Sequence, residues 1–530
     1  MVRFFLNGNL TVVRNIDSDT TLLRYLRTHE SLSGTKEGCG SGDCGACSVL
    51  LGEQQDGQWY YKAINGCITF VAQLNGKSVV TVDALATGRG TLTGGSDEPQ
   101  LHPAQQAMVD YHGSQCGFCT PGIVMSLAAL HESINNGEDA QQQATQHQII
   151  EALSGNLCRC TGYRPIIEAA SHLNDYPDNR PQAVQVWQPD ASASVDQGEG
   201  VATAASFSTN GQQAWAPETE EQLQSLLKEH PDARVVAGAT DLALEVTQFL
   251  KPINKLIALG GIDSLRTIRD EDHALLIGAG VTYSEAEPLL AKYFPEFAQL
   301  LTRLGSRQVR NNGTLGGNIA NASPIGDTPP VLLALGACIE LASAPGLVSG
   351  VGSRWIKLKD FFVDYKKTTL EAGEYIRTIK IPKLKADEQL KVYKISKRLE
   401  DDISAVLAAF KVTMSGDNSA SGGSKVAAIS TGFGGMAAIP KAAAELEAAL
   451  TGSPVNGTQF RQAAEKLAED FTPMSDVRAT DEYRLLVAKN LVQKCALELL
   501  QPDSISRIEN IHSSQLAASD AINLMENHNA

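Results

Sequence analysis

The chain has 530 residues and a mass of 56.5 kDa, which at roughly 100–200 residues per domain predicts three or four domains. Its 44 Lys and Arg residues against 60 Asp and Glu residues give a net charge of −16, so we expect no nucleic-acid partner and no anionic membrane surface. No apolar run reaches the roughly 18 residues of a membrane span. Asn7, Gly8 and Asn9 interrupt the N-terminal apolar stretch, so no signal peptide is expected and the sequence predicts a soluble cytoplasmic protein.

Residues 1–85 predict a small sheet with one helix and a Cys-rich loop. Residues 2–14 alternate loosely around Asn7-Gly8, which is typical of a β-hairpin. Residues 17–20 offer an N-cap for a short helix that contains Leu22, Leu23 and Leu26. Further strands are expected at Val49–Leu51, Trp59–Ile64 and Ser78–Val82.

Residues 86–173 predict a small bundle of four short helices. One helix follows His102 and a second follows Cys119, with Thr120 as the expected N-cap and Pro121 at the first helical position. Two more are expected at 146–153 and 165–173.

Residues 174–212 are rich in Pro, Asp, Ser, Gln and Gly and form the expected linker. After it, a capping box at Thr219–Gln222 and a strand at Arg234–Ala237 open a region of alternating helix and strand patterns. We divide this region into a domain at 213–385 and a second at 386–500. Residues 501–530 form a polar tail, in which 505–511 could form a short helix.

Eight of the ten cysteines lie in the first 160 residues, and disulfides are not expected in a reducing compartment. The first four are Cys39, Cys44, Cys47 and Cys67, which have the spacing of a plant-type 2Fe-2S ferredoxin site. Glycines at 38, 40, 42 and 45 would let the backbone approach the cluster sulfurs closely. A zinc site is the alternative, although this spacing fits zinc poorly.

The second four are Cys116, Cys119, Cys158 and Cys160, and each pair precedes a predicted helix start. The free N–H groups and positive dipole end of a helix N-terminus stabilise thiolates. Two such helix starts that face one another could hold a second cluster. The remaining Cys338 and Cys495 are expected to be buried small apolar residues.

The motifs Lys36-Glu-Gly-Cys-Gly-Ser-Gly-Asp-Cys-Gly-Ala-Cys47, Gln115-Cys-Gly-Phe-Cys-Thr-Pro-Gly122 and Gly155-Asn-Leu-Cys-Arg-Cys-Thr-Gly-Tyr-Arg164 resemble those of the molybdenum hydroxylases, the family that includes xanthine dehydrogenase and aldehyde oxidase. The resemblance spans residues 1–173. It implies a first 2Fe-2S cluster in a ferredoxin-like β-grasp domain and a second in a four-helix bundle. It also implies that Gln115 approaches the pterin of a molybdenum cofactor on a partner.

Two later loops, Arg234–Asp241 and Asn311–Asp327, contain glycines flanked by Thr and Asn, which can form backbone nests for a pyrophosphate. Either loop alone would more often be a plain turn. Together they resemble the flavin domain of the same family, over residues 217–500, which implies an α+β multidomain chain with a two-part FAD-binding unit of the PCMH and CO dehydrogenase flavoprotein type. The residues that this resemblance assigns to FAD are Arg234, Val235, Val236, Ala237, Gly238, Ala239, Thr240, Asp241, Thr314, Leu315, Gly316, Gly317, Asn318, Asp327, Ile376 and Lys394. Leu304 stands where some relatives carry Phe near the flavin ring.

The stretch Gly432–Ala437 also fits a dinucleotide-binding pattern, G-x-G-x-x-A, between a possible strand at 425–430 and a helix at 437–450. A Rossmann site would want an acidic residue about 20 positions further on, and residues 451–457 contain none. We therefore interpret this motif as structural support inside the flavin domain.

The order of cluster, cluster and flavin implies the electron-transfer subunit of a xanthine dehydrogenase-type enzyme. The resemblance places the molybdenum site on a separate large subunit, in a complex of two small and two large subunits. Electrons from oxidation of hypoxanthine or xanthine would pass through both 2Fe-2S clusters to FAD and on to NAD. We expect no catalytic acid or base in this chain. The alternatives are a subunit of an aldehyde or N-heterocycle hydroxylase, a stand-alone flavin–iron–sulfur reductase, or a zinc-stabilised scaffold protein.

Overall fold

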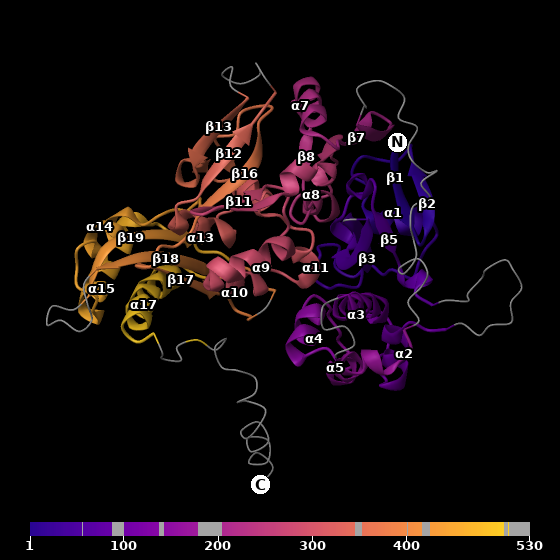
Figure 1. Ribbon diagram of the computed structural model, residues 1–530, viewed down its shortest axis with the longest axis horizontal. Coiled ribbons are helices and arrows are strands. Elements are labelled where there is room, and N and C mark those ends of the chain that lie inside the picture. The colour runs from indigo at the N-terminus through magenta and orange to yellow at the C-terminus, as the bar shows by residue number, and fades with distance from the viewer. Residues whose placement is uncertain are drawn as a thin grey trace, which may run out of the picture.

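The computed structural model describes residues 1–55, 57–86, 100–136, 143–178, 204–344, 352–399, 401–415, 424–502 and 507. Figure 1 shows the N-terminal sheet above a group of helices on one side, further sheets in the middle and at the top, and the C-terminal sheet with its helices on the opposite side. This arrangement agrees with the expected α+β multidomain class.

A five-stranded sheet forms the N-terminal part. Its strands, in spatial order, are β2 (Asn9–Val13), β1 (Val2–Leu6), β5 (Ser78–Val80), β3 (Ser48–Gln55) and β4 (Gln58–Asn65). The predicted hairpin is confirmed, with Asn7 and Gly8 both at positive φ in a two-residue turn between β1 and β2. The short 3-10 helices of this part are η1 (Gly66–Ile68), η2 (Val71–Leu74) and η3 (Val82–Ala84).

The N-cap of the helix α1 (Leu22–Thr28) lies one residue after the predicted range 17–20. Thr21 is the N-cap, and its hydroxyl accepts a hydrogen bond from the Arg24 N–H. The predicted cap at 17–20 is wrong, and two of its side chains, Ser18 and Asp19, bind the distant Ile253 instead. The Asp19 carboxylate accepts a hydrogen bond at 2.9 Å from the N–H of Ile253, which lies in the next domain of the chain.

The four predicted helices of the second part are confirmed as α2 (Pro103–Asp110), α3 (Thr120–Asn135), α4 (Gln146–Leu153) and α5 (Arg164–Ser171), with η4 (Leu173–Asp175) after them. Thr120 is not the N-cap of α3, as predicted, but its first residue, and Cys119 takes the cap position. The Thr120 hydroxyl contacts the Ser114 hydroxyl at 2.6 Å. It therefore does not cap its own helix, and the start of α3 coincides with one of the predicted cluster ligands.

A four-stranded sheet opens the next part, in the order β6 (Ala205–Thr209), β7 (Gln212–Ala216), β9 (Lys255–Ala258) and β8 (Arg234–Val236), with α7 (Glu220–Glu229) and α8 (Ala243–Thr247). The strand β6 and the start of β7 correct the predicted linker at 174–212. Phe207 is buried and its strand pairs antiparallel with β7, a contact that the Ser- and Gln-rich composition conceals. Residues 179–203 of the predicted linker lie outside the described residues.

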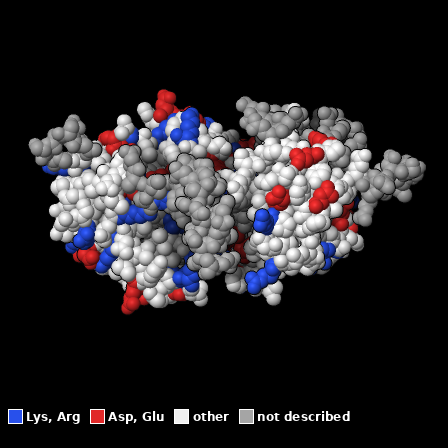
Figure 2. All heavy atoms as spheres, turned by 90° about the horizontal axis from the view of Figure 1, so that it is seen from below, with Lys and Arg blue, Asp and Glu red and all other residues white. Residues whose placement is uncertain are grey.

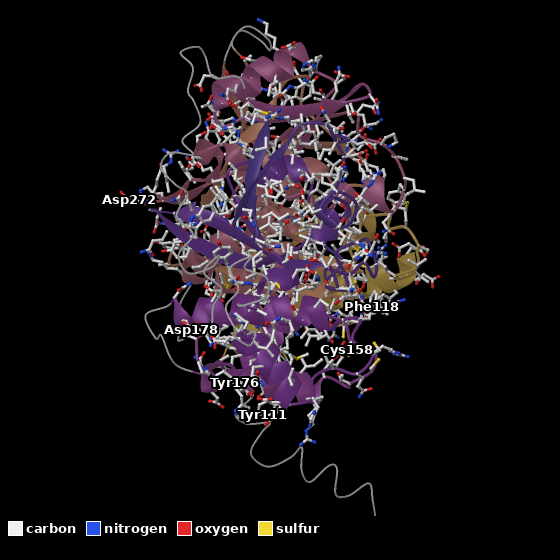
Figure 3. The ribbon with its side chains drawn as sticks, turned by 90° about the vertical axis from the view of Figure 1, so that its right-hand side faces the viewer. Tyr111, Phe118, Cys158, Tyr176, Asp178 and Asp272 are labelled. Atoms are coloured by element: carbon white, nitrogen blue, oxygen red, sulfur yellow. The ribbon has the colours of Figure 1, made fainter. Side chains whose placement is uncertain are left out.

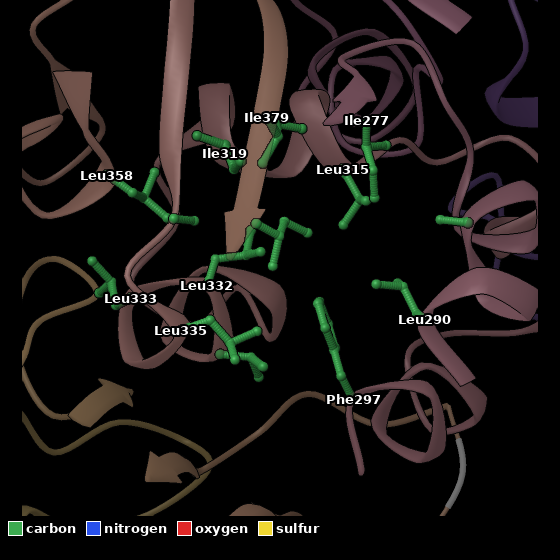
Figure 4. Close-up of a cluster of buried hydrophobic side chains, with 14 of the residues drawn as sticks. Ile277, Leu290, Phe297, Leu315, Ile319, Leu332, Leu333, Leu335, Leu358 and Ile379 are labelled. Carbon is green, nitrogen blue, oxygen red and sulfur yellow. The ribbon is translucent and has the colours of Figure 1, made fainter. Parts of the chain in front are cut away.

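A five-stranded antiparallel sheet follows, in the order β10 (Ile268–Asp270), β11 (Ala274–Gly278), β16 (Tyr375–Pro382), β12 (Cys338–Ala342) and β13 (Ser353–Lys357). Its other elements are α9 (Tyr283–Tyr293), α10 (Pro295–Thr302), α11 (Arg307–Arg310), α12 (Leu315–Asn321), α13 (Thr328–Leu335) and the hairpin β14 (Phe362–Asp364) and β15 (Lys367–Thr368), with the 3-10 helices η6 (Leu259–Gly261), η7 (Asp263–Arg266) and η8 (Leu358–Asp360). Figure 4 shows the apolar core between them, where Leu315 lies near Ile277 from the sheet.

The C-terminal part is a three-stranded sheet of β17 (Glu388–Ile395), β18 (Val406–Ser415) and β19 (Lys425–Gly434) with α14 (Ala444–Leu450), α15 (Gly457–Ala464), α16 (Leu467–Asp470) and α17 (Asp481–Leu500). The Gly432–Ala437 motif continues this strand instead of opening a helix, and α14 begins at Ala444 instead of the predicted 437. A Cβ at Gly432 would lie 1.9 Å from the Pro330 carbonyl oxygen of α13. This glycine therefore permits close packing, in agreement with the structural interpretation of the motif.

Apolar side chains of the N-terminal sheet and of the β6–β9 sheet form a single core. Phe4, Leu22 and Val79 belong to the same buried cluster as Phe207 and Leu256. The other face of the N-terminal sheet packs against α3 through Leu50 and Val80. Because apolar contacts are continuous across these boundaries, the three parts hold fixed positions relative to one another.

Four further expectations concern membrane helices, surface charge, the two remaining cysteines and the C-terminal tail. No described helix has the length and hydropathy needed to cross a bilayer. On the face in Figure 2, Lys and Arg side chains are interspersed with Asp and Glu side chains, so the visible part of that face has no broad field of one sign. Cys495 is buried as expected, whereas Cys338 is half-buried. Most of the predicted polar tail, including the possible helix at 505–511, lies outside the described residues, but Arg507 forms an ion pair of 2.6 Å with Glu498.

Candidate cluster and cofactor sites

The first site brings together the four cysteines predicted from spacing. Cys39, Cys44 and Cys47 lie on the loop between α1 and β3, and Cys67 lies in η1. The Cys39 thiol contacts the thiols of Cys44 and Cys67, and Cys67 also contacts Cys47. Contact with Cys44 and Cys67 holds the pKa of Cys39 below its ordinary value, and contact with Cys39 raises the pKa of Cys44. The four sulfurs therefore converge as a ligand set would.

The backbone around this site leaves space for the sulfurs. A Cβ at Gly38 would lie 2.7 Å from the Cys44 Sγ, and the N–H of Ser41 donates a hydrogen bond of 3.3 Å to the Cys39 Sγ. A glycine cradle with an N–H directed at sulfur fits a group held by anionic thiolates.

The second site lies where α3 and α5 begin. Cys116 contacts Cys160, and Cys119 contacts Cys158. Burial raises the pKa of Cys119 to about 12. Burial acts in the same direction on Cys158, but hydrogen bonds from the Thr161 hydroxyl and N–H outweigh it and lower the pKa of that thiol.

The two halves of the second site differ in exposure. Cys116 and Cys160 are exposed, whereas Cys158 is buried and Cys119 is half-buried. Figure 3 shows Cys158 and Phe118 at one edge of the molecule. Gln115, predicted to face a partner's cofactor, is exposed beside Cys116. The second site thus reaches the surface on the side of Cys116 and Cys160.

Direct backbone contacts join the two sites. The N–H of Leu157, next to Cys158, donates a hydrogen bond of 3.0 Å to the carbonyl of Cys44. The Asn156 side chain donates to the Gly45 carbonyl at 3.3 Å. A Cβ at Gly45 would lie 2.2 Å from the Gly155 carbonyl oxygen. Each ligand loop is therefore packed against the other with no intervening layer of side chains.

A cavity of about 380 Å³ lies between the two predicted FAD loops. The predicted FAD residues that line it are Arg234, Val235, Val236, Ala237, Gly238, Ala239, Thr240, Asp241, Thr314, Gly317 and Asn318. The sequence patterns missed six further lining residues, Leu242, Glu245, Tyr283, Ala320, Asn321 and Lys366. Lys366 comes from the β14–β15 hairpin, 39 residues after the end of the second loop, so no local motif could reveal it.

The first loop has the backbone of an anion site. Ala239 adopts a left-handed φ of 63°, and Leu242 after it is right-handed. The N–H groups from Gly238 to Leu242 have no hydrogen-bond acceptor within the described ranges of the chain. A left-handed residue beside a right-handed one can direct consecutive N–H groups to one point as a nest, and donors without a protein acceptor, such as those of the buried Gly238 and Ala239, are normally satisfied by a ligand or water. The residues present therefore fit a diphosphate.

The remaining predicted FAD residues lie apart from this loop. Lys394 forms a buried ion pair of 2.8 Å with Asp327, which also accepts a hydrogen bond from Ser404. Leu304, Leu315, Gly316 and Ile376 lie in or against the core of the central sheet. The structure thus joins Asp327 to Lys394 across 67 residues but directs Leu315 and Ile376 into the protein interior.

Residues of the N-terminal part bind both predicted FAD loops. Gln73 donates to the Ala237 carbonyl at 2.7 Å, and Asn311 donates to the Ala63 carbonyl at 2.8 Å. Gln248, at the end of α8, donates to the Cys39 carbonyl at 3.1 Å. The cavity and the first cysteine site are therefore parts of one hydrogen-bonded unit.

The helix α11, just before the second FAD loop, connects that unit to the helical part. Gln308 donates to Ser126 and Asn156, both at 2.9 Å. Arg310 is fully buried and pairs with Glu151 at 2.9 Å. The segment from 306 to 318 thus contacts the second site's domain, the first site's domain and the cavity.

Sequence reasoning also missed a third cluster of ligand-type side chains. His102, His131 and Glu132 are all buried, with their polar atoms within 4.8 Å of one another. The Nδ1 of His102 accepts the N–H of Ala104 at 3.1 Å, which leaves the proton on Nε2. A protonated Nε2 donates a hydrogen bond and does not bind a metal, so this arrangement favours a structural polar cluster.

Two four-thiol sites joined to a cavity with a diphosphate nest define an iron–sulfur flavoprotein. Family models match four stretches of the chain under these descriptions: 2Fe-2S iron-sulfur cluster binding domain (residues 4–72), 2Fe-2S binding domain (91–171), FAD binding domain in molybdopterin dehydrogenase (207–384) and CO dehydrogenase flavoprotein C-terminal domain (391–499). The chain belongs to the molybdenum hydroxylase family and carries its iron–sulfur and FAD domains.

Curated relatives agree with this assignment. The chain is 31% identical to xanthine dehydrogenase of Drosophila pseudoobscura pseudoobscura, over 98% of this chain and 40% of the relative. It is 33% identical to xanthine dehydrogenase of Drosophila subobscura, over 88% of this chain and 36% of the relative. The chain therefore spans 40% or less of the length of these relatives.

Among solved structures, quinoline 2-oxidoreductase from Pseudomonas putida 86 is 28% identical, with 54% of this chain and 96% of that chain covered and a TM-score of 0.48. The family assignment rests on the family models and the curated relatives.

Proposed function

We propose that this chain is the electron-transfer part of a xanthine dehydrogenase-type enzyme. Its two cysteine sites would carry electrons from a molybdenum site on a large partner subunit to FAD, and FAD would pass them to NAD during purine oxidation. The observation that carries the proposal is the unbroken contact from the exposed second site, through the first site, to the FAD cavity.

The chain's own residues set the order of the sites. Cys116 and Cys160 open to the surface, where a partner could approach beside Gln115. The Leu157–Cys44 hydrogen bond joins the second site to the first, and Gln248 joins the first to the helix that follows the FAD nest. When bound, a 2Fe-2S cluster carries one electron at a time and a flavin exchanges both one and two electrons, so the flavin suits the end of the path.

The residues assigned to FAD would position the cofactor and neutralise its charge, and would not take part in the reaction. The nest from Gly238 to Leu242 supplies N–H donors for the diphosphate. Lys394 is buried with its charge balanced by Asp327, so it offers a fixed donor rather than a free base.

The names of the relatives support xanthine as the substrate of the complex. Oxidation of hypoxanthine, and a complex of two small and two large subunits, are further parts of the proposal. An aldehyde or N-heterocycle hydroxylase would use the same electron path. The substrate site is outside the described residues in either case, so the partner's identity decides between them.

Native mass spectrometry of the protein purified from its source cells, with iron and cofactor analysis, tests the proposal. We expect about four irons, two per cluster, and one FAD per chain, with a molybdopterin-containing partner. Anaerobic NADH should reduce the iron–sulfur EPR signals through FAD. A colourless protein with stoichiometric zinc would contradict the assignment of the iron–sulfur and FAD sites. A flavoprotein that NADH does not reduce would contradict NAD as the electron acceptor.

A further inference from the structure

Lys366 lies at the rim of the FAD cavity, on an element that neither FAD loop includes. It is at the tip of the hairpin formed by β14 and β15, where Asp364 pairs with Lys367 across a two-residue turn. The base of the hairpin is anchored, because Phe361 and Phe362 are buried in the core of the central sheet. A fixed base holds the tip beside the cavity.

The backbone at the tip is strained. Lys366 adopts a left-handed φ of 53°, a conformation that favours Gly or Asn and costs other residues about 1 kcal/mol. Strained residues in folded proteins often mark a binding function. A glycine would relieve the strain, so the presence of a lysine needs another reason.

The charges that line the cavity give a reason for a lysine at this position. Arg234 and Lys366 are its cations, and Asp241 and Glu245 are its anions, so the lining is neutral as a whole. Arg234 is bound to Glu245 by two hydrogen bonds of 2.8 and 2.9 Å. Lys366 makes no ion pair with any residue in the described ranges. It is therefore the cation of this lining that is available to an anionic ligand.

Other cations near the nest are already engaged. Lys62, Lys77 and Arg266 line a neighbouring cavity that shares Ala237 and Thr314 with this one, but all three bind Glu53. They offer no free charge to the first cavity. Without Lys366, the lining would carry a net negative charge next to a dianionic ligand.

We propose that Lys366 binds the diphosphate of FAD from the hairpin side, opposite the backbone nest. The N–H groups of the nest and the Lys366 ammonium would then hold the diphosphate between them. The inference rests on the assignment of the cavity to FAD in the proposed function, and titration of the unaltered chain tests that assignment separately.

The test is a titration of the FAD-free full-length chain with FAD, followed by flavin fluorescence at two salt concentrations. Lys366→Ala should weaken FAD binding about tenfold at low salt, as loss of a hydrogen bond to a charged group predicts, and less at high salt. Lys366→Arg should keep most of the affinity. Lys367→Ala removes a neighbouring exposed cation that does not line the cavity, and it should change the affinity less than twofold. ADP, which carries the diphosphate without the flavin, should lose affinity for Lys366→Ala by the same factor as FAD.

Comparison of Lys366→Gly with Lys366→Ala separates charge from backbone strain, because both variants remove the charge and only the glycine also relieves the strain. An affinity as low as that of Lys366→Ala supports the charge, and an affinity equal to that of the unaltered chain overturns the inference. An Ala variant within twofold of the unaltered chain, a loss independent of salt, or an equal loss in Lys367→Ala would also overturn it. Absence of FAD binding to the unaltered chain would overturn the FAD assignment together with this inference.

Discussion

Replacement of Glu53 by Gln should destabilise the chain more than any removal of a surface charge. The Glu53 side chain on β3 is 10% exposed and contacts Lys62 at 2.8 Å, Lys77 at 2.6 Å and Arg266 at 3.0 Å. Lys62 lies on β4 and Lys77 immediately precedes β5 in the N-terminal part, and Arg266 belongs to η7 at the start of the central sheet. In Glu53→Gln the three cations face one another without this carboxylate between them.

The magnitude follows from burial. Removal of one partner from a buried ion pair costs about 3–5 kcal/mol, because the remaining charge keeps its desolvation penalty. A glutamine can still accept a hydrogen bond, and Glu285 still pairs with Arg266 at 2.6 Å. We therefore expect a loss near the lower limit, about 3 kcal/mol. Urea unfolding of the holoprotein at pH 7.5, followed by far-UV circular dichroism, measures it.

The pH dependence gives an independent check. Burial alone would raise the pKa of Glu53, but the charges of Lys77, Lys62 and Arg266 outweigh it and hold that pKa well below the ordinary range. A carboxylate with a lowered native pKa contributes stability above its unfolded pKa, about 4.3 for Glu, and loses it as the pH falls towards the native value. The stability difference between the unaltered chain and Glu53→Gln should be constant from pH 8 to pH 6 and shrink below about pH 4.3.

Glu469→Gln is the matched control. Glu469 pairs with Lys466 at 2.7 Å, as short as the Glu53 contacts, but its side chain is 55% exposed. Exposed pairs contribute about 0–1 kcal/mol, so this variant should lose less than 1 kcal/mol. A loss in Glu53→Gln no larger than that of the control, or a difference that grows as the pH falls, would refute the reasoning.

Three further predictions concern the sites. Cys44→Ser and Cys116→Ser should each lower the iron content by about two per chain and remove a different EPR signal, and loss of the same signal in both would contradict two separate clusters. Leu157→Pro removes the N–H that binds the Cys44 carbonyl, so it should slow electron transfer between the clusters at unchanged iron content. Leu157→Ala keeps the N–H and should transfer electrons at the normal rate; equal rates in both variants would count against that path. Ala239→Val places a β-branched residue at a left-handed φ of 63°. It should lower the FAD content and should lower the free energy of unfolding by about 1–2 kcal/mol, whereas Ala239→Gly should retain FAD. Equal FAD content in the Val and Gly variants would argue against the nest.

The features that could be predicted from the sequence are those that depend on neighbouring residues along the chain. The cysteine groups, the Asn7-Gly8 hairpin and the helix at 146–153 all follow from spacing over a few residues. The ligand groups converge because each depends on a short loop before a helix or strand. By contrast, Lys394 and Asp327 were predicted only from the resemblance to the family's flavin domain, since nothing in either local pattern indicates a partner 67 residues away.

The features that sequence missed depend on tertiary contact. Asn311 and Gln308 read as ordinary polar residues, yet they bind the carbonyl of Ala63 and the side chain of Asn156 in two other parts of the chain. The predicted cap at 17–20 failed for the same reason, because Asp19 binds Ile253 instead of its own helix. Polar side chains that join domains carry no periodicity, so a pattern search cannot separate them from solvated loop residues.

The common core of the N-terminal sheet and the β6–β9 sheet constrains how the protein is made. Asp19 and Ile253, which bind one another, are 234 residues apart. At a synthesis rate of about 5–20 residues per second, the ribosome needs roughly 10–50 s to add that many residues. Until then the apolar face of the first sheet cannot complete its core, although all eight cluster ligands have already been synthesised. Nascent chains would therefore present exposed apolar surface beside unprotected thiols, and insertion of iron and sulfur before FAD-domain synthesis would act on an incompletely folded protein.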